Sequence, residues 1–423
     1  MNKPAPAAPE RAPTNWTTAA MQRRIRGRYA AERRFRMLGL GAIIVSASFL
    51  AFLLISMFSQ GASGFTETRV ALPIDFAKSG MALDPERLRG PGADLALSGA
   101  GLEGVVDTAA GAAFGAVGGS DILSDGAWVR VRDAVKADPS LLGRSAAIEV
   151  PVSSAIDVAA KGNGAPEAEA VVAKLGDRLS RGLNFDFFGG ADSTDATRVG
   201  IWGALKGSLL TMLVTLALAF PIGVLSALYL EEYAPKNRWT DLIEVSINNL
   251  AAVPSIIFGL LGLAVFLGTF GLPRSAPIVG GLTLALMTMP VIVIAGRNAI
   301  KAVPPSIRDA ALGVGASPVQ VVFHHVLPLA LPGILTGTII GMARALGETA
   351  PLLMIGMRAF IAAPPDGFRD PATVLPVQIF LWSDEVSRGF VEKTSAAIIV
   401  LLVFLLAMNG VAIYLRNKFE TRW

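Results

Sequence analysis

Two charged residues stand four positions apart inside a long apolar segment. Arg344 and Glu348 are the only formal charges in the run from 332 to 355. A charge at the centre of a membrane helix costs about 2.5–3.5 kcal/mol on insertion scales, and such residues usually have a function. At this spacing the two share a helix face and can pair. Arginine also donates two parallel hydrogen bonds to an oxyanion. The pair is therefore interpreted as an anion relay, with a purely structural ion pair as the alternative.

A second polar stretch, residues 305–332, separates two apolar segments. It contains Asp-Ala-Ala, a Gly six positions after the Asp, and a Leu-Pro near its end. Pro305 or Ser306 suits the first turn of a helix. Gly313 and Gly315 can end that helix or adopt a left-handed conformation. The spacing predicts a short helix followed by a tight turn.

The composition indicates a membrane protein. The mean hydropathy is +0.54 and 52% of residues are hydrophobic, which is too apolar for a soluble chain. A bilayer-spanning helix needs about 20 apolar residues, and backbone groups in lipid must be hydrogen-bonded within the segment. We therefore predict an all-α polytopic membrane protein with six transmembrane helices, near 37–57, 207–230, 245–266, 277–296, 332–355 and 396–415.

The distribution of Lys and Arg predicts the orientation. Placing the amino terminus inside puts 17 basic residues in the inner loops and tails and five in the short outer loops. Both termini are therefore predicted to be cytoplasmic. Residues 1–36 form a basic tail, expected to be disordered and to lie against anionic membrane lipid. The segment 37–57 is an uncleaved signal anchor, because its apolar run is longer than that of a signal peptide.

Residues 58–200 differ in kind from the rest of the chain. They contain no spanning segment, and 13 basic against 19 acidic residues give a net charge of −6. We predict a small α+β extracytoplasmic domain inserted after the first helix. Alternating apolar residues indicate strands at 127–131 and 147–150, and 168–178 indicates a helix. Residues 201–423 then form the membrane core.

Several classes of function are excluded. No Gly-rich loop with the Walker spacing is present, so any ATP must be hydrolysed by another chain. No nucleophile, base and acid set is evident, so the chain is not predicted to be an enzyme. There is no cysteine, and the adjacent His324 and His325 point in different directions on a helix. No metal site and no nucleic-acid partner are predicted.

The polar stretch resembles the coupling loop, or EAA loop, of ABC-importer permeases. In that family the loop forms a short cytoplasmic helix and a turn, and it docks into a groove on a separate ATPase subunit. Asp309 stands where the family usually has Glu, and His325 where an aliphatic residue is common. The resemblance implies that the ATPase is contacted by Asp309, Ala310, Ala311, Gly315, Leu327 and Pro328.

Two further strings point to one branch of this family. Residues 343–351 read ARALGETAP and resemble the signature of the permease pair of phosphate importers. Residues 375–380, LPVQIF, resemble a stretch of the A-type subunit of that pair. The resemblance implies a five-helix, MetI-like permease core. It also implies a substrate-pathway role for Arg344, extended with more caution to Glu348 and Thr349.

The same helix carries Gly333, Gly337 and Gly341 at intervals of four residues. Such a stripe lets another helix approach closely. Helix packing is the interpretation, and a seam with a second permease is one form that the packing would take.

The resemblance implies an inner-membrane permease subunit of a bacterial, ATP-driven phosphate importer. The implied partners are a second permease, two copies of an ABC ATPase that use ATP and Mg, and a periplasmic phosphate-binding protein. No cofactor is expected on this chain. Two alternatives are open. One is the same fold importing another oxyanion, such as sulfate or molybdate. The other is a membrane-bound sensor with 58–200 as its receiver. The role of 58–200 is not indicated by the sequence.

Overall fold

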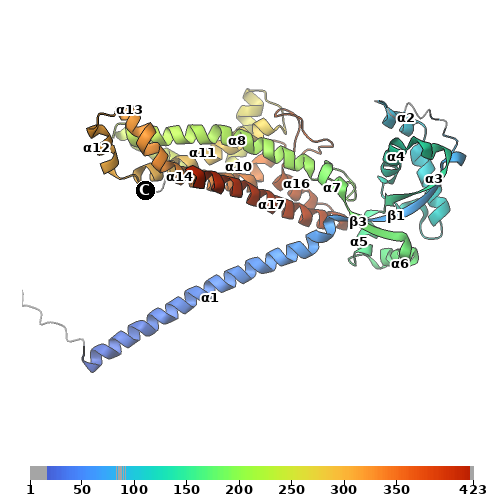
Figure 1. Cartoon of the computed structure of the whole chain (residues 1–423), viewed down its shortest axis with the longest axis horizontal. Coiled ribbons are helices and arrows are strands. Elements are labelled where there is room, and N and C mark those ends of the chain that lie inside the picture. Colours follow the sequence, from blue (N-terminus) through green and yellow to red (C-terminus); the bar gives the residue numbers. More distant parts are fainter. Residues whose placement is uncertain (1–16, 82, 84–87, 89, 91, 420–423) are drawn as a thin grey trace, which may run out of the picture. The chain divides into compact units, whose positions relative to one another are not determined.

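The computed structural model describes residues 17–81, 83, 88, 90 and 92–419. The chain divides into two compact units, 1–57 and 58–423. Each unit is described by itself, with the element labels of Figure 1.

The first unit is dominated by one helix. Helix α1 (Ala19–Gly64) has 46 residues and contains the predicted span 37–57. It begins 18 residues before that span, so residues 19–36 are helical and the prediction of a disordered tail is wrong for them. Ala and Arg dominate this stretch and are strong helix formers. The part of the predicted tail at 1–16 lies outside the described residues.

Residues 65–200 form a domain with both strands and helices, called here the α+β domain. Strands β1 (Thr66–Asp75), β2 (Ser145–Pro151) and β3 (Leu179–Leu183) pair antiparallel in the order β2-β1-β3. The helices are α2 (Ala93–Gly99), α3 (Leu102–Phe114), α4 (Ala127–Ala137), α5 (Ser154–Ala160), α6 (Pro166–Leu175) and α7 (Phe185–Gly189). Short 3-10 turns lie at Phe76–Lys78, Gly119–Ile122, Pro139–Gly143 and Gly176–Arg178. The core of the domain includes Val70, Leu72 and Ile74 of β1.

One of the predicted strands in this domain is wrong. Residues 127–131 begin helix α4, whose buried residues Ala127, Val131 and Val135 recur every fourth position. That interval places them on one helix face, and a five-residue window is too short to distinguish it from alternation. The strand predicted at 147–150 is confirmed in β2. The helix predicted at 168–178 is α6, which ends at Leu175.

The membrane core, from residue 202 onward, is built of helices. It begins with α8 (Trp202–Leu228), and its further long helices are α9 (Arg238–Ala251), α11 (Pro277–Lys301), α14 (Leu327–Gly347) and α17 (Arg388–Phe419). Its shorter helices are α10 (Ser255–Leu261), α12 (Pro305–Gly313), α13 (Pro318–Gln320), α15 (Ala350–Met354) and α16 (Leu375–Ser383). Segments Tyr229–Tyr233, Gly262–Thr269 and Val321–Val326 are π-helical. Helix α11 packs against α8 and α14, and α14 packs against α17 (Figure 1).

Two predicted spans are interrupted. Among the described residues, five helices are long and apolar enough to cross a membrane, or six if one bent pair is counted as a span. That pair replaces the straight helix predicted at 245–266: α9 and the helix beginning at Ser255 meet at 103°. Pro254 lies at the bend and disfavours helical geometry in the residue before it. The helix predicted at 332–355 ends at Gly347, and α15 begins at Ala350.

The glycine stripe of α14 lies against α11 of the same chain. A Cβ added at Gly337 would lie 2.1 Å from Cβ of Ala295, and one at Gly333 would lie 2.7 Å from Cβ of Ala299. At Gly341 the nearest atom would be Cγ2 of Thr288, at 2.9 Å. The stripe is thus occupied within this chain, and the interpretation of it as a seam with a second permease is wrong.

Gly337→Val is expected to destabilise the core by about 1–3 kcal/mol, the usual cost of overpacking. The inserted protein should show a lower midpoint of thermal unfolding in detergent. Ala295→Gly should partly restore that midpoint in the double variant, because it removes the clashing Cβ. The matched control is Gly410→Ala in α17, since nothing lies within 4 Å of that position. An unchanged midpoint for Gly337→Val would contradict the close packing.

Candidate functional site

Arg344 lies in the last turn of α14 and pairs with the residue that ends the helix. Nε of Arg344 is 3.5 Å from Oε1 of Glu348, which is the C-cap residue. The Arg344 side chain is 49% exposed and that of Glu348 19%. The prediction that both residues lie deep in one continuous helix is therefore wrong. A positive charge is favoured at a helix C-terminus because the backbone carbonyls there are unpaired.

The break after Arg344 has a local cause. Gly347 has a low helix propensity, and Pro351 has no N–H and disfavours helix in the residue before it. Thr349 is the N-cap residue of α15 and is half-buried. The bent pair meets this break: a Cβ on Gly259 of α10 would lie 2.6 Å from Cα of Pro351. Two interrupted helices therefore come together close to Glu348, which sequence reasoning missed.

The cavity beside the two residues that follow Arg344 is very small. A cavity of about 10 Å³ is lined by residues that include Ala345, Leu346 and Thr211. A cavity needs about 10–15 Å³ to hold even one water molecule. An anion the size of phosphate does not fit there. The Arg344 side chain does not line this cavity and is 49% exposed, so it can meet a ligand from outside the chain.

The coupling loop has the predicted local structure. Pro304 is the N-cap residue of α12 and Pro305 occupies the first turn. Gly315 has φ +91°, a left-handed conformation that disfavours residues with a Cβ. Ser317 and Gln320 then form a reciprocal capping box at α13. The turn at Gly315 thus links two helices whose starts are both fixed by their own residues.

The residues predicted to contact an ATPase differ in exposure. Asp309 and Ala310 are exposed on α12, and Ala311 is buried. Leu327 is half-buried and Pro328 exposed at the start of α14. The exposed part of the loop also includes the apolar side chains of Leu312 and Val314. The loop presents one acidic residue and four large apolar residues, Leu312, Val314, Val319 and Phe323, to the outside of the chain.

A network of ion pairs holds the coupling loop to the ends of two core helices. Nη2 of Arg308, on α12, lies 2.7 Å from Oε1 of Glu232, just beyond α8. Arg308 also donates to the carbonyls of Ile300 and Val303 near the end of α11, at 3.0 and 2.7 Å. Sequence reasoning missed these pairs, which join residues far apart in the chain. The only local signal is Glu231-Glu232 at the end of an apolar segment.

The neighbouring pairs extend the network to α9. Arg297 of α11 pairs with Glu244 of α9 and, at 3.4 Å, with Glu231. Lys301 lies 3.5 Å from Glu231. Helices α8, α9, α11 and α12 are thus connected at one end of the core.

Helix α14 joins the two candidate sites. Leu327 is its first residue and Arg344 lies 17 positions later. At 1.5 Å per residue this separation is about 26 Å along the helix. The coupling loop and Arg344 therefore lie at opposite ends of one helix that packs along its length on α11.

Comparison with known proteins identifies the family. Residues 219–421 match the model described as "Binding-protein-dependent transport system inner membrane component", and residues 22–170 match a domain of unknown function. Residues 219–421 thus carry the domain of this family of transport permease components, and the apolar helices of the described residues are those of an integral membrane protein. The prediction of a mostly helical membrane protein with a MetI-like permease core is thus confirmed.

Individual relatives agree with this assignment. A "Phosphate transport system permease protein PstA 1" of Mycobacterium tuberculosis is 33% identical over 206 residues, 48% of this chain and 66% of the relative. A "Phosphate transport system permease protein PstA" of Haemophilus influenzae is 29% identical over 228 residues, 54% of this chain and 79% of the relative. The chain thus spans just under two thirds of the length of the first of these relatives.

A solved structure matches about the same share of this chain as these relatives do. An inward-facing form of the MetNI methionine ABC transporter contains a chain that is 18% identical, with a TM-score of 0.41. The match covers 52% of this chain and 95% of that one.

Arg308→Gln is expected to loosen α12, because the variant loses the charge-assisted bonds to Glu232 and to two carbonyls. Such bonds contribute roughly 1.5–3 kcal/mol each when partly buried. Backbone amides of 306–313 should exchange with deuterium several-fold faster. Lys301→Gln is the control, since its side chain is exposed and makes a single longer pair. Equal exchange in both variants would show that Arg308 does not position the loop.

Proposed function

We propose that this chain is a permease subunit of an ATP-driven importer of inorganic phosphate. The observation that carries the proposal is the half-exposed guanidinium of Arg344 at the end of a core helix. It is supported by the family match and by relatives named as phosphate transport permeases. Arginine suits this substrate because its planar fork matches two phosphate oxygens and stays charged at all physiological pH values.

The pathway is proposed to lie between this chain and a second permease. The cavity beside Ala345 is too small for an anion, and Arg344 is open on the outside of the chain. An anion that leaves water for a low-dielectric passage needs a cation or aligned donors in place of its hydration shell. Arg344 supplies that charge, Glu348 orients the guanidinium, and Thr349 lies beside them with a hydroxyl that can donate.

Coupling to ATP is proposed to pass through 305–332. The exposed Asp309, Leu312 and Val314 form a surface that fits a groove on an ATPase. Two ATPase copies bind ATP and Mg, and a periplasmic phosphate-binding protein delivers the substrate. Movement of α12 reaches α14 and α11 through the turn at Gly315 and the bonds of Arg308. In this arrangement both termini are cytoplasmic, and the α+β domain is on the opposite side of the bacterial inner membrane.

Arg344→Gln is expected to abolish phosphate uptake, or to reduce it at least about 100-fold, because a desolvated charge-assisted contact contributes several kcal/mol. The pair with Glu348 is exposed enough that its loss should change stability by about 1 kcal/mol or less. Uptake is measured with radiolabelled phosphate in liposomes that contain the whole complex. Arg344→Lys should retain partial uptake, because a point charge lacks the bidentate geometry.

The double variant Arg344→Gln with Glu348→Gln separates substrate binding from pairing. It should remain inactive, although no charge is left unpaired. Normal uptake by the double variant would mean that the two residues form only a structural pair. Competition by sulfate or molybdate in the wild-type complex tests the alternative substrates, and inhibition by either one at phosphate-like concentrations would favour that oxyanion instead.

Gly315→Val is expected to prevent productive docking on the ATPase, because a β-branched residue resists φ +91°. Uptake and substrate-stimulated ATPase activity should fall together while the protein still inserts. Gly313→Ala is the matched control: it lies in the same loop and nothing is within 4 Å of its added Cβ. Full activity of Gly315→Val in a complex of normal composition would contradict the coupling role.

A further inference from the structure

Three large apolar side chains are exposed on a short segment of the α+β domain. Leu183 ends β3 and is 56% exposed, and Phe185 and Phe188 of α7 are 68% and 47% exposed. Isolated apolar residues on a surface are ordinary, but a contiguous group marks an interaction site. The group spans six positions of the sequence and is called here the aromatic edge.

The aromatic edge adjoins the junction where α1 ends and β1 begins. Leu183 is the strand partner of Thr66, two residues after the end of α1. The backbone N–H of Asn184 donates to the carbonyl of Phe65, at 2.9 Å. The ring of Phe188 stacks on that of Phe65, with centroids 5.6 Å apart and planes 7° from parallel. Leu183 and Phe188 thus lie next to the junction in space.

The junction itself is fixed to the first turns of α17. Nζ of Lys393 donates to the carbonyl of Gly64, at 2.8 Å. A Cβ on Gly64 would lie 2.5 Å from the carbonyl oxygen of Glu392, so the two backbones are in close contact. After Lys393 the helix continues into the apolar segment 396–415. Gly64 therefore lies at the level where α17 changes from charged to apolar, which is the level of a membrane surface.

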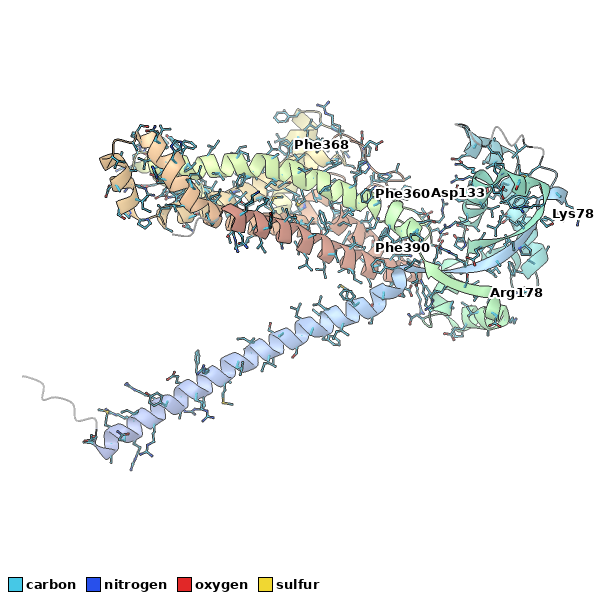
Figure 2. The ribbon with its side chains drawn as sticks, in the orientation of Figure 1. Lys78, Asp133, Arg178, Phe360, Phe368 and Phe390 are labelled. Atoms are coloured by element: carbon cyan, nitrogen blue, oxygen red, sulfur yellow. The ribbon has the colours of Figure 1, made fainter. Side chains whose placement is uncertain are left out.

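The segment between the exposed residues is held rigidly. Asn184 is buried and its side chain accepts the N–H of Phe187. The ring of Phe187 is buried, lies 5.2 Å from Nζ of Lys393 and packs on Trp382, at 6.4 Å between centroids. Trp382 in turn packs on Phe390, which is labelled at the start of α17 in Figure 2. Phe188 packs edge-on against Phe187, with centroids 5.6 Å apart, and is still 47% exposed, while Phe185 is 68% exposed.

We propose that the aromatic edge inserts into the membrane surface and anchors the α+β domain to lipid. The edge is proposed to contact the boundary between the headgroups and the acyl chains of the adjacent leaflet. Phenylalanine and leucine carry no polar atom on their side chains, so they favour the acyl side of that boundary. The buried Lys393 ammonium and the Gly64 carbonyl bond to each other at the adjoining junction. The α+β domain is thereby fixed at the bilayer by lipid contact in addition to its bonds to α17.

The absence of cysteine makes a direct test practical. The full chain is prepared with Phe185→Cys or Phe188→Cys as its sole thiol, labelled with bimane and placed in phosphatidylcholine nanodiscs. Lipid brominated on the acyl chains should reduce bimane emission at both positions several-fold more than at Leu95→Cys. Leu95 is the matched control, because it is 81% exposed on α2 of the same domain. Leu406→Cys, on the exposed face of α17, is the positive control and shows how much brominated lipid reduces the emission of a site in lipid.

Two results would overturn the proposal. One is quenching by brominated lipid at 185 and 188 that does not exceed that at 95. The other is quenching by aqueous iodide at 185 and 188 that equals that at 95, since this would show that the edge is in water. Using two positions guards against a local disturbance, because a substitution that unfolds the short helix at one of them is detected by disagreement with the other.

Discussion

The close contact between α11 and α14 is the constraint on which the rest of the core depends. Three glycines of α14 leave no room for a side chain between the two helices, so their backbones approach within a distance that larger residues forbid. Helix α14 cannot bend freely along this contact. A displacement at its start is therefore carried to its end, where Arg344 and Glu348 lie. Helix packing inside one chain thereby connects two sites about 26 Å apart.

The two ends of the α11–α14 pair make different contacts. At the coupling loop, Arg308 bonds to the last carbonyls of α11 and to Glu232, so α12 moves with the ends of α8 and α11. At the other end α14 stops at Gly347 and the bent α9–α10 pair contacts Pro351. Interrupted helices leave backbone groups unpaired, and in transporters such groups are tolerated where they face a cavity or a partner.

The sequence predicts those features that depend on a few adjacent residues. Apolar runs locate most of the spans, and Gly315 predicts a left-handed turn because only glycine adopts it without strain. Prediction from the sequence fails where the structure depends on contacts between residues far apart, or where one pattern fits two kinds of element. Hydropathy does not reveal the bend at Pro254 or the early end of α14. The spacing of apolar residues at 127–131 fits both the period of a strand and that of a helix. The partners of Arg308 lie at the ends of two helices, α8 and α11, far from it in the sequence. The roles of Arg344 and of the loop residues stay predictions.

The central claim is that Arg344 faces an aqueous anion pathway completed by a partner subunit. Gly347→Cys tests it without altering Arg344, because position 347 is exposed, one turn away, and has nothing within 4 Å of its added Cβ. The rate of modification by a charged, water-soluble thiol reagent is measured in the assembled complex, with and without phosphate. The account predicts that the thiol reacts and that phosphate slows the reaction while chloride does not. A thiol that is inaccessible, or that reacts at the same rate with phosphate present, would contradict it.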